Sequence, residues 1–208
     1  MIQRIDSGDL YLLTNIVKLL NFNGLCCFPS LDRPMTMMFE AVVLVSCCLV
    51  SVMAAHARDA QSTGGYDGLV AKLALLASCC FTGAAFYINI AEQPARLRLK
   101  MEGALSQWKL AYIRGFAMQA SLAVLSGSAG LYTYYVRGDW QWLLGGLCML
   151  LNWPYTLLLM MPTNKRLMAT QASQVGMATK ELMVKWGSLH AFRTLLGAIA
   201  SVLFLITL

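Results

Sequence analysis

Five apolar segments of roughly membrane-spanning length dominate this chain and restrict the folds open to it. An α-helix needs about 20 apolar residues to cross the hydrocarbon core of a bilayer. The chain is 58% hydrophobic and 12% charged, with a mean hydropathy of +0.60, whereas soluble domains carry roughly 25% charged residues. These values predict an integral membrane protein with an all-α fold, a transmembrane helical bundle. The predicted spans are 35–55, 72–91, 115–136, 140–161 and 189–208.

The first span has two interpretations. Its apolar core, 41–53, is short, Glu40 lies at its edge, and residues 54–57 (Ala-Ala-His-Ala) are typical of a signal-peptide cleavage site. The segment is therefore either a retained span or a cleaved signal sequence, and we favour the retained span. We expect an amino-terminal extension with this one span, 1–69, followed by a four-helix domain, 70–208.

The distribution of basic residues predicts the orientation of the spans. Lys and Arg are concentrated in the loops 92–114 and 162–188, while the turn 137–139 holds Arg137 alone. Because cytoplasmic loops carry an excess of Lys and Arg, both loops should face the cytosol or an equivalent compartment, which we call the inner side. The net charge of +6 includes these loop residues and does not indicate nucleic-acid binding. The lipid bilayer is the expected partner, and the organelle is left open.

Both inner loops also carry helical patterns. After Pro94, apolar residues recur at helical spacing along 95–110 and charged residues take the other face or the ends, which predicts a helix lying on the inner membrane surface. A second surface helix is expected from Asn164 toward Trp186, with Thr163 as its amino-terminal cap. Together these helices would cover the inner mouth of the bundle. The apolar stripe of segment 95–110 consists of Leu97, Met101, Ala104, Leu105 and Trp108.

The third and fourth spans should form a tight hairpin, since only residues 137–139 separate them. Gly127, Gly130 and Gly197 should permit close approach between helices. Cysteines inside the spans are expected to be small buried hydrophobic residues; they are Cys47, Cys48, Cys79, Cys80 and Cys148. The aromatic residues that flank the turn are expected at the headgroup level as an outer belt; they are Tyr132, Tyr134, Tyr135, Trp140 and Trp142.

Polar residues of the spans gather at one depth. If the spans alternate in direction, these residues all fall toward the inner side. Burial of polar groups in lipid is costly, so a cluster at one depth predicts a functional pocket, with His190 and Arg193 near its mouth and Asn152 at its floor. The cluster consists of Asn89, Glu92, Gln119, Asn152, Thr156, Thr163, Asn164, His190 and Arg193.

His190 and Arg193 lie one helical turn apart and share a face. Repulsion by the guanidinium would keep the imidazole neutral, which suits a general base, and the same Arg could stabilise an oxyanion. The alternative is an interfacial His beside a snorkelling Arg. Glu92 has two candidate partners, Arg193 and Arg96. Around Pro154, the polar residues either line a cavity opened by a kink or satisfy the interrupted backbone.

Other site classes find little support. Only two histidines occur, and no Cys/His, His-x-x-x-His or Glu-x-x-His spacing is present, so we expect no metal. Nucleotide-binding glycine motifs are absent as well. Nothing in the sequence calls for a haem or a flavin, and we expect no cofactor.

Several blocks in order along 70–208 resemble the anthrone oxygenase-like membrane family. The first is Phe81-Thr82-Gly83-Ala84-Ala85-Phe86-Tyr87-Ile88-Asn89, followed by Glu92-Gln93-Pro94-Ala95-Arg96. Then come Trp108 with Tyr112, Asn152-Trp153-Pro154-Tyr155-Thr156, Met161-Pro162-Thr163-Asn164 and Trp186-Gly187-Ser188-Leu189-His190-Ala191-Phe192-Arg193. Residues 1–69 and their extra span depart from the pattern.

The resemblance implies a four-helix membrane bundle and, for characterised members, oxidation of polyketide anthrones to anthraquinones without an obvious cofactor. Most members have no assigned activity. The expected catalytic residues are His190 and Arg193. The expected substrate-binding residues are Asn89, Glu92, Trp108, Tyr112, Asn152, Thr156, Asn164 and Trp186.

The function expected from these residues is oxygenation of a planar aromatic or polyketide substrate. A small aromatic or lipid-like molecule is therefore the expected ligand. Two alternatives stay open: a non-catalytic multi-pass membrane subunit whose polar cluster holds the bundle together, and a protein that binds or carries a small molecule or a lipid.

Overall fold

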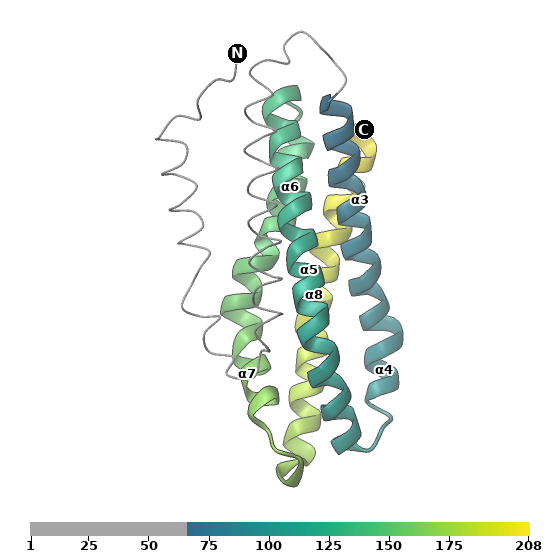
Figure 1. Cartoon of the computed structure of the whole chain (residues 1–208), viewed down its shortest axis with the longest axis vertical. Helices are drawn as coiled ribbons and strands as arrows, with labels where there is room; N and C mark the ends of the chain where they lie inside the picture. The colour runs from purple at the N-terminus through teal and green to yellow at the C-terminus, as the bar shows by residue number, and fades with distance from the viewer. Residues whose placement is uncertain (1–65) are drawn as a thin grey trace, which may run out of the picture.

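The computed structural model describes residues 66–208, which fold into four long helical columns that run side by side (Figure 1). The described part contains no strand, so the predicted all-α bundle is confirmed. A 3-10 turn, η5 (Ala172–Gln174), precedes the last column. The columns are α3 (Tyr66–Tyr87) with η3 (Ile88–Glu92) and α4 (Gln93–Arg96); α5 (Met101–Arg137); α6 (Trp140–Tyr155) with η4 (Thr156–Met160) and α7 (Met161–Ala169); and α8 (Met177–Thr207).

Three of the four columns, 68–96, 140–169 and 177–207, are long and apolar enough to cross a membrane. The fourth, α5, has 37 residues and contains the predicted span 115–136, but small and polar residues such as Ser126 and Thr133 occupy its buried side. The predicted span 35–55 lies outside the described residues. The structure describes only residues from Tyr66 onward, where α3 begins. The predicted division into an extension, 1–69, and a four-helix domain, 70–208, therefore stays a prediction.

The prediction of two helices on the membrane surface is wrong. The first column ends at Arg96, the chain turns over 97–100, and the remainder of segment 95–110 belongs to α5. Asn164 and Thr163 lie inside α7, which continues α6, and the chain reverses only between Ala169 and Met177.

The apolar stripe of 95–110 explains this outcome. Leu105 and Trp108 are buried against Met183 and Trp186 of α8, so the stripe packs inside the bundle rather than against lipid headgroups. Because these segments extend the helices, a column can be longer than a bilayer is thick. The 31 residues of α8 span about 46 Å, whereas the hydrocarbon core of a bilayer is roughly 30 Å thick.

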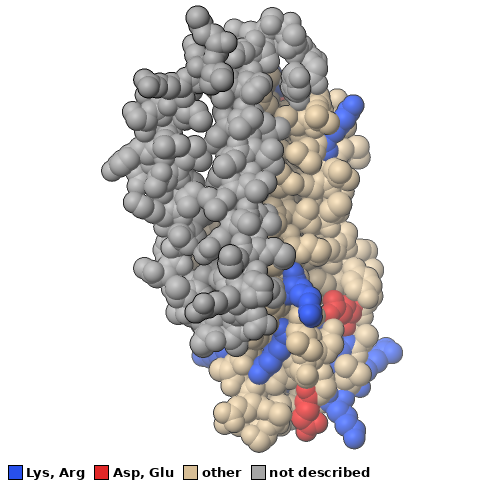
Figure 2. Space-filling view, in the orientation of Figure 1, with Lys and Arg blue, Asp and Glu red and all other residues tan. Residues whose placement is uncertain are grey.

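Charged residues gather at the lower end of the bundle as drawn (Figure 2). This end carries the α4–α5 and α7–α8 connections (Figure 1), and we call it the charged end. Lys109 Nζ of α5 donates a hydrogen bond to the carbonyl of Thr170 across it, at 2.7 Å. The charged end therefore contains both loops that the sequence places on the inner side.

The opposite end carries the predicted tight hairpin. α5 ends at Arg137, and Gly138 adopts the left-handed conformation with φ 82°, which glycine tolerates at a helix carboxyl terminus. Below the turn, α5 and α6 approach closely: a Cβ on Gly127 would lie 2.6 Å from Cγ of Leu150 and 3.0 Å from the carbonyl oxygen of Gly146. The close approach expected at Gly127 is therefore present.

Two expectations for the spans need correction. Tyr135 and Trp140 are exposed, as an aromatic belt requires, but Trp142 is fully buried and stacks on Phe204 at 4.8 Å between ring centroids. Trp142 faces the core because it lies on the side of α6 that packs against α8. Cys148 is buried, but Cys79 and Cys80 are exposed because they lie on the outer face of α3.

Candidate functional site

A cavity of about 200 Å³ lies between the columns on the side of the charged end. All four columns contribute to its wall. It is lined by eight of the predicted site residues, Glu92, Trp108, Tyr112, Thr156, Asn164, Trp186, His190 and Arg193. The other lining residues are Ala84, Tyr87, Ile88, Arg96, Ala111, Gly115, Phe116, Met118, Gln119 and Met160. Asn89 and Asn152 lie outside this lining.

Two π-helical turns shape the wall of the cavity. η3 and η4 are each five residues long, and together they contribute Ile88, Glu92, Thr156 and Met160. Each is followed by a proline at the second position of the next helix, Pro94 or Pro162. Proline cannot donate to the carbonyl four residues earlier and its ring crowds that carbonyl, and a widened turn relieves the conflict. The columns thus continue through both prolines, and the widened turns border the cavity.

His190 is buried in α8 and contacts Asn89 of η3, whose side-chain amide lies 2.6 Å from Nδ1 of the imidazole. The amide can be placed in two ways. With its oxygen toward the ring it accepts a single hydrogen bond from Nδ1. With its nitrogen toward the ring it donates to Nδ1 and to the carbonyl of Ala85 at 3.2 Å, and its oxygen accepts from the backbone N–H of Ala191 at 3.2 Å.

We adopt the second placement of the Asn89 amide because it forms three hydrogen bonds instead of one. Nδ1 of His190 is then an acceptor, so the neutral imidazole carries its proton on Nε2. Asn89 therefore orients His190 from outside the cavity lining. In this tautomer His190 can donate a hydrogen bond to a ligand, whereas the sequence suggested a base.

A chain of aromatic rings holds His190 from the other side. Trp186 stacks on the imidazole with 4.9 Å between ring centroids. Trp108 meets Trp186 edge to face at 5.8 Å, and Tyr112 stacks on Trp108 at 4.8 Å with an interplanar angle of 9°. Asn164 donates to the hydroxyl of Tyr112 at 3.1 Å. These flat surfaces suit a planar ligand, since aromatic rings prefer stacked or edge-to-face contacts.

Buried polar atoms without a hydrogen-bond partner are concentrated at this cavity. Five of the lining residues contribute such atoms: Trp108 Nε1, Gln119 Nε2, Asn164 Oδ1, Trp186 Nε1 and Arg193 Nε. Leaving one buried polar group unpaired costs about 1–3 kcal/mol. Four of these five atoms are N–H donors, and each belongs to a residue that lines the cavity.

Arg193 lines both the main cavity and a smaller one. Both cavities are lined by Arg193 and Thr156, and only the smaller one is lined by Asn152. The guanidinium carbon of Arg193 lies 5.4 Å from the ring centroid of Phe81, which covers one of its faces. The expectation that Asn152 forms the floor of the main cavity is therefore not met.

Asn152 serves the backbone of its own helix. Its side-chain nitrogen donates to the carbonyls of Cys148 and Met149 at 3.1 and 3.2 Å, and the hydroxyl of Thr156 donates to the carbonyl of Asn152 at 2.7 Å. α6 continues past Pro154 to Tyr155. Of the two interpretations of this segment, the geometry favours the one in which polar side chains satisfy backbone groups around a proline.

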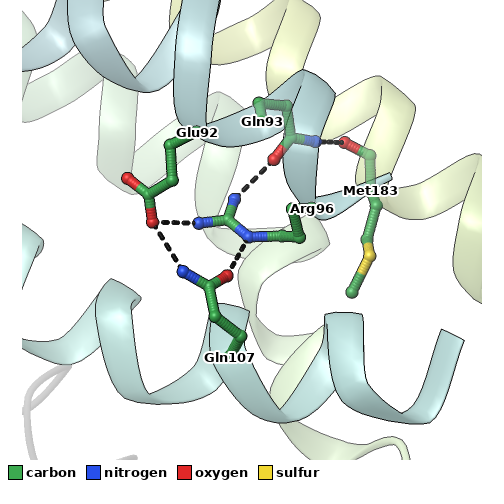
Figure 3. Close-up of polar contacts among 5 residues, drawn as sticks. All are labelled: Glu92, Gln93, Arg96, Gln107 and Met183. Atoms are coloured by element: carbon green, nitrogen blue, oxygen red, sulfur yellow. Dashed lines mark hydrogen bonds and ion pairs between the residues drawn. The ribbon is translucent and has the colours of Figure 1, made fainter. Parts of the chain in front are cut away.

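A second polar network joins the cavity to the charged end (Figure 3). Glu92 and Arg96 form an ion pair at 2.5 Å, so of the two candidate partners of Glu92 the structure selects Arg96. Gln107 of α5 donates to the same carboxylate oxygen at 2.8 Å and accepts from Nε of Arg96. Gln93 accepts from Arg96 and donates to the carbonyl of Met183 at 2.8 Å. The network ties α4 to α5 and α8.

The sequence indicated Arg96 only as a candidate partner of Glu92, and it did not indicate Gln107 at all. The predicted surface helix would expose Arg96, yet Arg96 is buried, lines the cavity and lies 5.8 Å from the ring centroid of Trp186. The spacing of Glu92 and Arg96, at i,i+4 on one helix face, agrees with their ion pair. Among residues 66–208, no group of three or more His, Cys, Asp or Glu side chains is placed to hold a metal ion.

Comparisons with known proteins identify related sequences. The sequence profile of the anthrone oxygenase family matches residues 108–203. An anthrone oxygenase of Claviceps purpurea is 30% identical over 138 residues, which cover 60% of this chain and 79% of that protein. One of Cryptosporiopsis sp. is 33% identical over 107 residues, which cover 48% of this chain and 61% of that protein. No solved structure matches the chain.

Proposed function

The chain belongs to the anthrone oxygenase family, and on that premise we propose that its cavity binds a planar aromatic ketone and oxygenates it with dioxygen. The observation that carries the proposal is that four residues of the cavity lining each hold a buried hydrogen-bond donor without a partner: Trp108, Gln119, Trp186 and Arg193. An engineered apolar cavity of roughly 150 Å³ holds a benzene ring, and this one measures about 200 Å³.

The proposed reaction begins with loss of a proton from the methylene carbon opposite the ketone. The electron pair then spreads onto the ketone oxygen, and Nε2–H of His190 and Nε–H of Arg193 are the donors that would stabilise the resulting oxyanion. Asn152 has no part in this proposal, because its amide nitrogen is occupied by backbone carbonyls.

Glu92 is the proposed proton acceptor. Among the residues that line the cavity, Glu92 is the one with a carboxylate side chain. Its Oε1 accepts hydrogen bonds from Arg96 and Gln107. The second oxygen, Oε2, is the one that would receive the proton. A carboxylate held by two fixed donors is positioned for proton transfer. We therefore assign the base role, expected for His190, to Glu92.

Dioxygen completes the reaction without another oxidant. The electron pair on the carbon forms a bond to oxygen and leaves a peroxide anion, which takes up a proton. Loss of water from this hydroperoxide, with removal of the second methylene hydrogen, gives a second carbonyl group. The sum is ketone plus dioxygen to quinone plus water. The residues of the cavity bind, orient and transfer protons.

We also propose that the chain is a multi-pass membrane protein with its charged end on the inner side. Support comes from the three columns that are long and apolar enough to cross a bilayer and from the Lys and Arg residues of both connections at that end. An apolar aromatic substrate would be concentrated in the same lipid phase.

The test is oxidation of anthrone by the purified chain in lipid nanodiscs under ¹⁸O₂, with the anthraquinone analysed by mass spectrometry. We expect turnover above the spontaneous rate and one labelled oxygen per product molecule. Ser188→Ala is the matched control, because Ser188 lies on α8 beside His190 but is exposed and outside the lining. A rate no greater than that in protein-free nanodiscs would reject the enzyme and leave a binding or structural protein.

A further inference from the structure

The cavity wall is closed on one side and open on the other. Every lining residue from η4, α7 and α8 is buried: Thr156, Met160, Asn164, Trp186, His190 and Arg193. The exposed lining residues come from the other two columns. Tyr87 of α3 is 60% exposed and Met118 of α5 is 48% exposed. The cavity therefore reaches the outer surface between α3 and α5.

Small residues border this opening on both helices. Ala84 of α3 and Ala111 and Gly115 of α5 line the cavity and are half-buried. A Cβ added to Gly115 would meet no atom within 4 Å. Open space therefore lies in front of Gly115, and a larger side chain could enter it without displacing a neighbour.

The surface around the opening is largely apolar, with one exposed cation, Arg114, beside Gly115 on α5. Phe86 and Ile90 on the first column are 52% and 59% exposed, and Leu110 on α5 is 60% exposed. Glu92 lies a little further toward the charged end, and the opening itself falls within the column segment 68–96 that could cross a membrane. The opening therefore lies in the part of the surface that a bilayer would cover, close to its inner boundary.

We propose that the cavity opens sideways into the bilayer between α3 and α5, and that an apolar planar ketone dissolved in the lipid enters past Gly115. The independent indication of a ligand is that two lining residues, Gln119 and Arg193, each hold a buried donor without a hydrogen-bond partner. The identity of the ligand rests on the proposed function, whereas the direction of the opening does not.

The test uses thiol labelling of the full chain in lipid vesicles. Its native cysteines are replaced by alanine or serine, and a single cysteine is introduced by Gly115→Cys. One probe is an apolar maleimide that dissolves in the bilayer, and the other is a charged, membrane-impermeant thiosulfonate. For each probe, the labelling rate at position 115 is divided by its rate with a free thiol in solution. We expect this ratio to be at least about tenfold higher for the apolar probe than for the charged probe, because the charged reagent must leave water to reach the opening.

A control separates the opening from the surface around it. Gly83→Cys places the thiol on the exposed face of α3, outside the cavity lining. Anthraquinone should slow labelling at position 115 and leave labelling at position 83 unchanged. Equal or faster labelling at 115 by the charged probe would overturn the lipid route, and absence of labelling by both probes would show that there is no opening. Lack of protection by anthraquinone, with the probe preference intact, would contradict the proposed ligand alone.

Discussion

The side-chain amide of Asn89 lies 2.6 Å from Nδ1 of His190, although the two residues are 101 positions apart in the chain. With the amide nitrogen toward the ring, Asn89 determines which imidazole nitrogen carries the proton. In the proposed reaction His190 is then a hydrogen-bond donor rather than a base. The contact is one of those that join the first column to the last.

Substitution of Asn89 by aspartate should reverse that tautomer. A carboxylate accepts from Nδ1–H, so Nε2 of His190 would lose its proton and could no longer donate to the oxyanion. We expect Asn89→Asp to lower kcat by about 10²-fold, which is typical of removing one such donor. ¹⁵N NMR of histidine-labelled protein, with two histidines in the chain, would report the tautomer directly. Unchanged or increased activity in Asn89→Asp would instead identify His190 as the base.

Glu92→Gln should remove the proton acceptor while keeping the shape of the network in Figure 3. We expect kcat for anthrone oxidation to fall by about 10²–10⁴-fold, the usual contribution of a positioned general base. Gln107→Ala is the comparison: it removes a hydrogen bond to the carboxylate without removing the carboxylate, and its effect should be much smaller. Equal losses in the two variants would mean that the network acts by positioning alone.

Arg193→Lys should impair turnover although the positive charge is kept. A guanidinium presents a planar fork of donors, and Nε of Arg193 is buried without a hydrogen-bond partner; an ammonium is a point charge at another position. We expect kcat to fall by about 10²-fold. Arg98→Lys, at an exposed position near the charged end, serves as the control. Wild-type turnover in Arg193→Lys would favour a snorkelling arginine with no part in the reaction.

The contact between α5 and α6 gives a stability prediction. Gly127→Ala places a Cβ 3.0 Å from the carbonyl oxygen of Gly146, so we expect a loss of about 1–3 kcal/mol in unfolding free energy, as in other overpacked cores. Gly83→Ala meets open space inside α3 and should leave stability unchanged or raise it by up to about 1 kcal/mol, because alanine favours a helix interior over glycine. Denaturant unfolding of both variants checks this. Equal stability of the two variants would contradict the close approach.

The sequence predicted the bundle well because apolar length and turn chemistry act locally. The hairpin at Gly138 is predicted because only three residues separate two apolar spans. The polar cluster is predicted because its residues lie at similar distances from the inner ends of spans that alternate in direction. Eight of the ten predicted site residues line one cavity, because residues at equal depth on neighbouring helices are brought together by packing. Their roles in binding and catalysis stay predictions.

What the sequence did not predict depends on non-local geometry. In the sequence, Pro94 and Pro162 indicate positions where a span ends and a surface helix begins. In the structure, a π-helical turn before each proline allows the helical column to continue. That continuation carries Arg96 inside the bundle. The hydrogen bonds of Asn89 and of Gln107 join residues far apart in the chain, and periodicity along one helix carries no information about such partners.

The central claim is that the cavity is a site of chemistry rather than a polar clasp that holds the bundle together. Parallel measurement of anthrone turnover and thermal unfolding in wild-type protein, His190→Gln and His190→Ala tests it most directly. We predict a fall in kcat of about 10²-fold or more in both variants, with unfolding temperatures within about 4 °C of wild type. Unchanged turnover would contradict a role for His190 in the reaction. The opposite result would be a large loss of stability in both variants, with turnover reduced only by the fraction of protein that is unfolded. That result would show that the polar cluster holds the bundle together and has no part in the reaction.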